Sequence, residues 1–202
     1  MTTTNPAPDT ELLRQLRCGT ATAFQTLYQR HQGPLFRFAV LRCGSTDTAA
    51  DVVQEVFMGL LAGSFNFDPL RGPLPNFLFG VARKLILKHE HPRQREESLP
   101  ELEDEEFETG SEAHEPLTRM LSDELAEQVR RAIALLPPHY RDAVILFELH
   151  ELSYLEIADI CQVDIGTVRS RLSRGRAAMA KRLVLHRPLS STRSEAAQEV
   201  AK

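Results

Sequence analysis

The 202-residue sequence has no long uninterrupted apolar run. No stretch approaches the roughly 18 apolar residues that cross a bilayer as a helix. The N-terminal residues, Met-Thr-Thr-Thr-Asn-Pro-Ala-Pro, lack the basic and apolar regions of a signal peptide. We therefore expect no membrane insertion and a cytoplasmic location.

Cysteine is scarce and widely spaced, since Cys18, Cys43 and Cys161 form no CxxC pair. In a reducing compartment this pattern predicts buried free thiols, not a disulfide or a metal site. His150 begins a sequence similar to a zinc-protease motif, but Tyr154 stands where the second histidine is required. No Ser/His/Asp, Cys/His or metal set occurs at usable spacing, so we expect neither an enzyme nor a bound cofactor or metal.

The alternation of polar and apolar residues typical of β-strands is also absent, and apolar residues recur instead at helical spacing. Asp9 is a candidate N-cap for the first helix, which should stop at Gly19. Gly33-Pro34 should separate the second helix from the third, and Pro92 should end the helix that starts around Pro75. The other expected helices cover about 48–62, 118–135, 138–149, 153–160 and 164–184.

These elements predict an all-α protein with two helical domains joined by an acidic flexible linker. The expected N-terminal domain covers residues 9–92, and the linker covers 93–116 because it is polar with little periodic apolar content. A four-helix helix-turn-helix domain covers 117–185, and a tail without core residues covers 186–202.

Charge is strongly segregated, although the net charge is only −4. Residues 96–115 contain ten acids and no lysine or arginine, whereas residues 165–187 contain seven lysines or arginines and no acid. A modest net charge therefore does not exclude nucleic-acid binding by the basic segment.

The basic segment lies in a helix-turn-helix pattern. Ser153 followed by Glu156 forms a capping box at the start of the first motif helix, and Asp164 is a plausible N-cap for the second. Leu155 and other apolar residues of the first helix should pack inward. On the second helix the expected buried stripe consists of Ile165, Val168, Leu172 and Met179.

Short hydroxyl and arginine side chains fall mainly opposite that stripe and suit the major groove of DNA. The alternative is an ordinary solvated basic face on a helical bundle. The capping box and turn favour DNA binding, but this motif alone does not separate a repressor, an activator and a polymerase subunit.

A second pattern lies in residues 51–61, where Val53, Val56, Phe57 and Leu60 form an apolar side. Asp51, Gln54 and Glu55 recur at helical spacing and should share one exposed patch. Such a patch is either a solvated helix face or a docking site for a basic helical partner.

Several motifs together resemble bacterial RNA polymerase sigma factors of the extracytoplasmic-function (ECF) group. They are Asp51–Phe57 (DVVQEVF), Phe67–Gly72 (FDPLRG), Phe77–Arg83 (FLFGVAR), Leu136–Arg141 (LPPHYR) and Gly166–Leu172 (GTVRSRL). They occur in the family's order and cover about residues 9–92 and 120–184.

The resemblance implies a dissociable subunit that directs promoter-specific transcription initiation. Asp51, Gln54 and Glu55 would bind the clamp helices of the largest subunit of core RNA polymerase. An anti-sigma factor would hold the protein inactive. A helix-turn-helix repressor or activator that acts without core polymerase is the alternative, but it would not need the 51–57 pattern.

The resemblance also implies two contacts with promoter DNA. At the −10 element a flipped base would lie near the loop around Phe65 and Phe67, and Arg83, Lys84 and Lys88 would meet the backbone. The two phenylalanines could instead be core aromatics. At the −35 element the contacts would come from Thr167, Arg169, Ser170, Arg171, Ser173 and Arg174.

The acidic linker carries one more expectation from the resemblance, because family members thread this segment through the RNA path of the polymerase. Ten acids would mimic the charge of RNA, and neutralising residues 101–108 would then alter the release of abortive transcripts. A solvated tether is the alternative.

Overall fold

In the computed structural model, which describes residues 7–96 and 116–185, every regular element is a helix and none of these residues forms a strand. The all-α prediction is therefore confirmed for the described residues. None of their helices is both long enough and apolar enough to cross a membrane.

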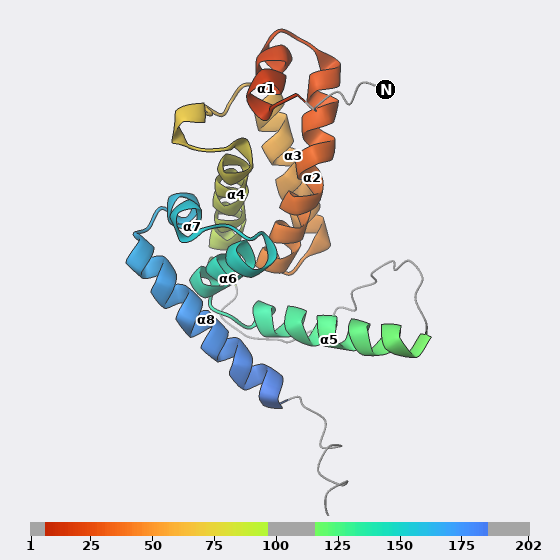
Figure 1. Cartoon of the computed structure of the whole chain (residues 1–202), viewed down its shortest axis with the longest axis vertical. Helices are drawn as coiled ribbons and strands as arrows, with labels where there is room; N and C mark the ends of the chain where they lie inside the picture. Colours follow the sequence, from red (N-terminus) through yellow and green to blue (C-terminus); the bar gives the residue numbers. More distant parts are fainter. Residues whose placement is uncertain (1–6, 97–115, 186–202) are drawn as a thin grey trace, which may run out of the picture.

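Four α-helices form the first half of the fold, which we term the N-terminal unit (Figure 1). They are α1 (Asp9–Arg17), α2 (Ala21–Cys43), α3 (Thr46–Leu61) and α4 (Leu74–Glu96). A loop with one 3-10 turn, η1 (Pro69–Arg71), connects α3 to α4, as the clustering of proline and glycine predicts.

The second half, the C-terminal unit, contains α5 (Pro116–Ala134), α6 (Pro138–Val144), α7 (Tyr154–Cys161) and α8 (Ile165–Leu185). A π-helical segment, η2 (Ile145–Leu149), continues directly from α6. The sequence predicts one regular helix over 138–149, whereas the α-helical part ends at Val144 and a π-helical turn follows it.

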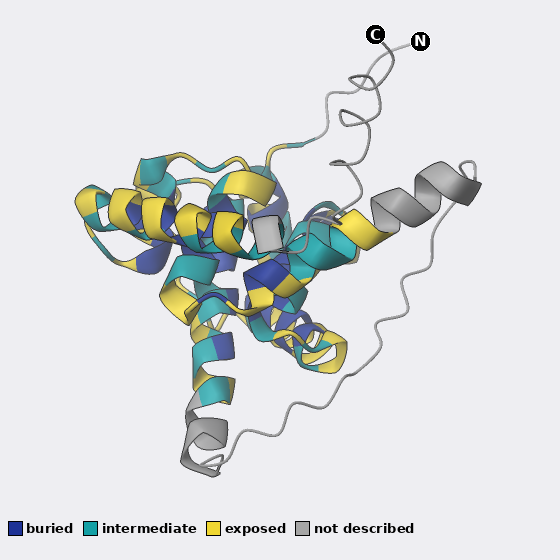
Figure 2. Ribbon diagram, turned by 90° about the horizontal axis from the view of Figure 1, so that it is seen from below, coloured by how far each residue is buried: buried dark blue, intermediate teal, exposed yellow. Residues whose placement is uncertain are grey.

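The two units share one continuous hydrophobic core. Buried residues lie where helices face one another, and exposed residues follow the outer surfaces (Figure 2). Helices α6 and α7 lie against α2 and α4, while α8 packs on the far side of α6 and α7 (Figure 1). The two units are therefore packed against each other.

The predicted break at Gly33-Pro34 is wrong, because α2 runs through Pro34 without interruption. A proline inside a helix removes a hydrogen bond and costs about 3 kcal/mol. Leu27, Leu35 and Phe38 lie on one buried side of α2, and each buried side chain of this size contributes about 1.5–3 kcal/mol. Continuous burial on both sides of the proline thus outweighs its local cost.

Two other helix boundaries differ from the prediction. Helix α4 continues through Pro92 to Glu96, and the carbonyl that this proline leaves without a partner belongs to the exposed Lys88, where water can reach it. Asp9 is the first residue of α1 and not its N-cap. Its carboxylate is bound instead by Arg30 and, at 2.9 Å, by Nε2 of His31.

The helix-turn-helix is built as its caps predict. The Ser153 hydroxyl accepts from the Glu156 amide while Glu156 accepts from the Ser153 amide, which completes the capping box. Asp164 accepts from the Thr167 amide at 2.8 Å and so caps α8. Leu155 is 67% exposed, so its predicted inward packing is wrong: α7 is only eight residues long, and Ile157 and Ile160 already occupy its buried side.

Residues 97–115 and 186–202 lie outside the described residues. The expectations for most of the acidic linker and for the whole tail fall there.

Candidate nucleic-acid and partner-binding surfaces

Helix α8 presents a basic, hydroxyl-bearing face to solvent. Val168 and Leu172 are fully buried, and they fix the rotation of the helix about its axis. The predicted −35 residues on the outer side are Arg169, Ser170, Ser173 and Arg174, all exposed, with Thr167 half-buried beside its cap. Ile165 and Met179 are partly buried and pack against the core, so the predicted stripe is only partly buried.

The arginines of α8 have different surroundings. Arg169 lies over the ring of Tyr154, 5.9 Å from its centroid. Arg176 is bound to Glu148 at 2.6 Å and lies over Phe147. Arg171 is half-buried, and its Nη1 has no hydrogen-bond partner among the described residues. The structure therefore groups five of the predicted −35 residues on one face and sets Arg171 apart from them.

The predicted acidic patch on α3 is fully formed. Asp51, Gln54 and Glu55 are all exposed, whereas Val52 and Val56 are buried. Glu55 lies 3.7 Å from Nε2 of His89 on α4. The patch is therefore open to a partner over its whole area, with one weak lateral contact.

An apolar groove lies beside this patch, and the sequence carries no local signal for it. It lies between α2 and α3, has a volume of about 530 Å³, and includes Gln54 in its wall. Tyr28, Phe36 and Met58 are each more than a third exposed there. Helical spacing alone does not separate an apolar stripe from its edge, and Tyr28 and Phe36 lie at the edge of the buried side of α2.

The loop between α3 and α4 holds the aromatics expected at the −10 element. Phe67 is 7% exposed and packs on Phe77, with 5.4 Å between ring centroids. Phe65 is half-buried and lies 6.4 Å from the same ring. Its ring lies so close to Gly59 that a Cβ there would overlap it. Phe67 is thus buried beneath the loop, while Phe65 is partly exposed to solvent.

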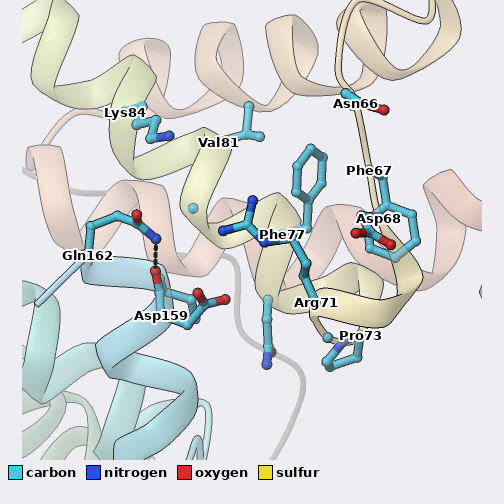
Figure 3. A pocket seen from close by; sticks show the side chains of 14 residues that line it. Asn66, Phe67, Asp68, Arg71, Pro73, Phe77, Val81, Lys84, Asp159 and Gln162 are labelled. Carbon is cyan, nitrogen blue, oxygen red and sulfur yellow. Dashed lines mark hydrogen bonds between the residues drawn. The ribbon is translucent and has the colours of Figure 1, made fainter. Parts of the chain in front are cut away.

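The basic residues of α4 do not all face solvent. Lys84 and Lys88 are exposed, but the Nε of Arg83 donates to Asp142 of α6 at 2.7 Å. Lys84 lines a cavity of about 190 Å³ between the α3–α4 loop, α4 and α7 (Figure 3). The predicted −10 surface is therefore partly covered by the C-terminal unit.

The three cysteines are free, as predicted, but only Cys161 is buried; Cys43 is half-buried and Cys18 exposed. Burial raises the pKa of the Cys161 thiol to about 11, so this thiol is unreactive at neutral pH. Within 7–96 and 116–185 no group of His, Cys, Asp and Glu could hold a metal ion.

Comparison with known proteins identifies both halves of the chain. Residues 27–96 match the family described as Sigma-70 region 2, and residues 126–179 match Sigma-70, region 4. The chain is 35% identical over 179 residues to the ECF RNA polymerase sigma-E factor of Escherichia coli K12, covering 85% of this chain and 92% of that protein.

A longer relative is the ECF RNA polymerase sigma factor SigE of Mycolicibacterium smegmatis. It is 31% identical over 166 residues, which cover 81% of this chain and 63% of that protein. Among solved structures, the sigma factor RpoE of Bartonella quintana, in complex with the anti-sigma factor NepR, superposes with a TM-score of 0.64 at 25% identity. That match covers 81% of this chain and 98% of RpoE.

The exposed α3 patch, the basic face of α8 and the matches to both sigma regions lead to one assignment. The chain belongs to the ECF group of RNA polymerase sigma factors, which bind core RNA polymerase and direct it to promoters.

Proposed function

We propose that core RNA polymerase docks on the α3 patch and the adjacent apolar groove as one continuous surface. The observation that carries this proposal is the position of Gln54, which belongs to both. Protein interfaces commonly have an apolar, aromatic-rich centre and a charged rim. Here Tyr28, Phe36 and Met58 supply the centre, while Asp51 and Glu55 supply an acidic rim for the clamp helices of the largest subunit.

The two promoter elements are assigned to different units. We assign the −35 element to the exposed face of α8, and the −10 element to the α3–α4 loop together with Lys84 and Lys88. Phe65 is better placed than Phe67 to meet an unstacked base, because its ring is partly accessible. The protein acts in this proposal as a cytoplasmic initiation subunit without catalysis of its own.

An anti-sigma factor is the proposed negative regulator. Support comes from the B. quintana complex, in which a sigma factor of this fold is bound to such a protein. A repressor or activator that acts without polymerase is not favoured, because the relatives are sigma factors.

Run-off transcription tests the docking surface. Wild-type protein with core polymerase and fragmented genomic DNA should yield discrete transcripts, and the double variant Asp51→Lys, Gln54→Ala should yield none. Charge reversal places a like charge against a basic partner surface, which costs several kcal/mol.

The matched control is Glu124→Lys, which reverses an exposed charge on α5, away from the groove. It should leave the transcripts unchanged. Equal transcript yields from wild type and the double variant would show that polymerase docks elsewhere. Tight sequence-specific DNA binding by the wild type, with no transcripts at all, would favour the repressor or activator class.

Arg174 on α8 gives a second test. Arg174→Ala should weaken binding to duplex promoter fragments recovered from the run-off experiment by roughly 5- to 100-fold, because a good arginine–base contact contributes about 1–3 kcal/mol. Fluorescence anisotropy at fixed salt measures the change.

Arg176→Ala removes the same charge two residues further along, but Arg176 already binds Glu148 and covers Phe147. This control should lose much less affinity. Similar losses for the two variants would indicate that α8 contributes only general charge and does not read bases.

A further inference from the structure

A buried ion cluster joins the two units. Asp142 of α6 is 1% exposed, and its carboxylate accepts from Nε of Arg42 on α2 and, at 2.7 Å, from Nε of Arg83 on α4. Arg42 is fully buried and also donates to Glu90 at 2.5 and 3.0 Å. Arg42 and Arg83, the two arginines that bind Asp142, thus both belong to the N-terminal unit.

Further polar contacts cross the same boundary. Arg141 donates to the carbonyl oxygen of Arg42 at 2.8 Å. Near the other end of the contact, Nδ2 of Asn76 on α4 donates to Glu156 of α7 at 2.9 Å. A buried charge is tolerated only when it is paired and hydrogen-bonded. The contact between the two units therefore includes specific polar pairs and is not only apolar.

The C-terminal unit lies over part of the surface assigned to the −10 element. Asp159 of α7 and Gln162, which directly follows α7, face Arg71, Phe77 and Lys84 across one cavity (Figure 3). Arg83, which the sequence places among the residues that meet the DNA backbone, is held by the Asp142 carboxylate. A carboxylate and a phosphate present similar anionic oxygens to a guanidinium. Asp142 thus gives Arg83 the kind of anionic partner that a backbone phosphate would provide.

This packing is incompatible with simultaneous contact to both promoter elements. Elements centred about 25 base pairs apart are separated by roughly 85 Å along the helix axis at 3.4 Å per base pair. Side chains of α4 and α6 are in direct contact in the structure. The two units must therefore separate before α8 and the α3–α4 loop can engage one promoter.

We propose that Asp142 is an autoinhibitory latch: it binds Arg42 and Arg83, closes the C-terminal unit over the −10 surface, and competes with DNA phosphate for Arg83. This inference rests on the proposed function, because it assigns the −10 element to the covered surface. Only the open fraction of the protein can contact both promoter elements, so the latch lowers the apparent affinity for the promoter by that fraction.

The test compares Asp142→Asn with Glu148→Gln in the full-length chain. Both changes replace a carboxylate of the C-terminal unit by its amide, but Glu148 pairs with Arg176 inside that unit. Spin labels are attached at the exposed Cys18, which directly follows α1, and at a cysteine replacing the exposed Ala177 of α8, with Cys43 and Cys161 replaced by alanine. Double electron–electron resonance then measures the distance between the units.

Wild type and Glu148→Gln should give one narrow, short distance distribution, and Asp142→Asn should add a longer one. The apparent affinity of Asp142→Asn for a duplex promoter fragment recovered from the run-off experiment should rise about tenfold or more, because removing one partner of a buried ion pair strongly disfavours the closed state. Asn76→Ala, which breaks a different contact across the boundary, should also broaden the distance distribution.

Unchanged distances in both Asp142→Asn and Asn76→Ala, with circular dichroism showing folded protein, would overturn the latch. A broad distribution in the wild type would overturn it as well. If the run-off experiment yields no promoter, the proposed function fails and the inhibitory role fails with it. The distances between the two labels would then still show whether Asp142 holds the two units together.

Discussion

Replacing Phe38 by alanine should lower the free energy of unfolding by about 3–5 kcal/mol. Phe38 of α2 is completely buried, and its ring packs on Phe79 of α4 with 5.4 Å between centroids and faces His150 of the C-terminal unit at 6.4 Å. Its removal would leave a cavity where three elements meet. Total stabilities of about 5–15 kcal/mol make this a large fraction, and urea denaturation followed by circular dichroism measures it.

Phe36→Ala is the matched control, two residues earlier on the same helix. Phe36 is 37% exposed in the groove between α2 and α3, so its loss should change stability by less than about 1 kcal/mol. We expect it instead to weaken core-polymerase binding, because it removes an aromatic ring from the proposed interface. Equal destabilisation by the two variants would contradict the assignment of Phe38 to the core and Phe36 to the groove.

This pair of residues also shows what can be read from the sequence. Helical spacing predicts that α2 carries apolar residues, and the caps at Ser153 and Asp164 predict the helix-turn-helix. Spacing gives the direction of a side chain around its own helix and nothing about what covers it. Phe36 and Phe38 therefore look alike in the sequence, and only the packing of neighbouring helices distinguishes them.

Tertiary packing also explains the wrong break at Pro34. Local signals treat glycine and proline as helix breakers, but a core that buries residues on both sides of Pro34 keeps α2 intact. The Asp142 cluster has no local signal at all. Arg42 and Asp142 are 100 residues apart, and a charged residue in a sequence is normally expected at the surface.

We expect His150 to make the packing of the two units sensitive to pH. It follows η2, and its ring lies 4.6 Å from that of Phe79. Its Nε2 is buried without a hydrogen-bond partner in the described part of the chain. Burial, with a smaller effect from the positive charge of Arg37, lowers the pKa of His150 from 6.5 to about 4. The packed state therefore holds this histidine neutral.

Acidification should consequently destabilise the packed state. The unfolded chain takes up a proton on His150 near pH 6.5, whereas the packed state does so only near pH 4. The stability that depends on neutral His150 is complete above pH 6.5 and is lost as the pH falls toward 4, by up to about 3 kcal/mol. Urea denaturation at several pH values measures this slope.

His150→Phe should remove that part of the slope, because phenylalanine does not titrate and can still pack against Phe79. Carboxylates also titrate below pH 5, so the informative quantity is the difference in slope between the variant and the wild type. His139→Phe, at an exposed position on α6, is the matched control and should retain the wild-type slope. A wild-type slope in His150→Phe would mean that His150 is already accessible to water and protons in the native protein, and that the contact with Phe79 does not exclude them.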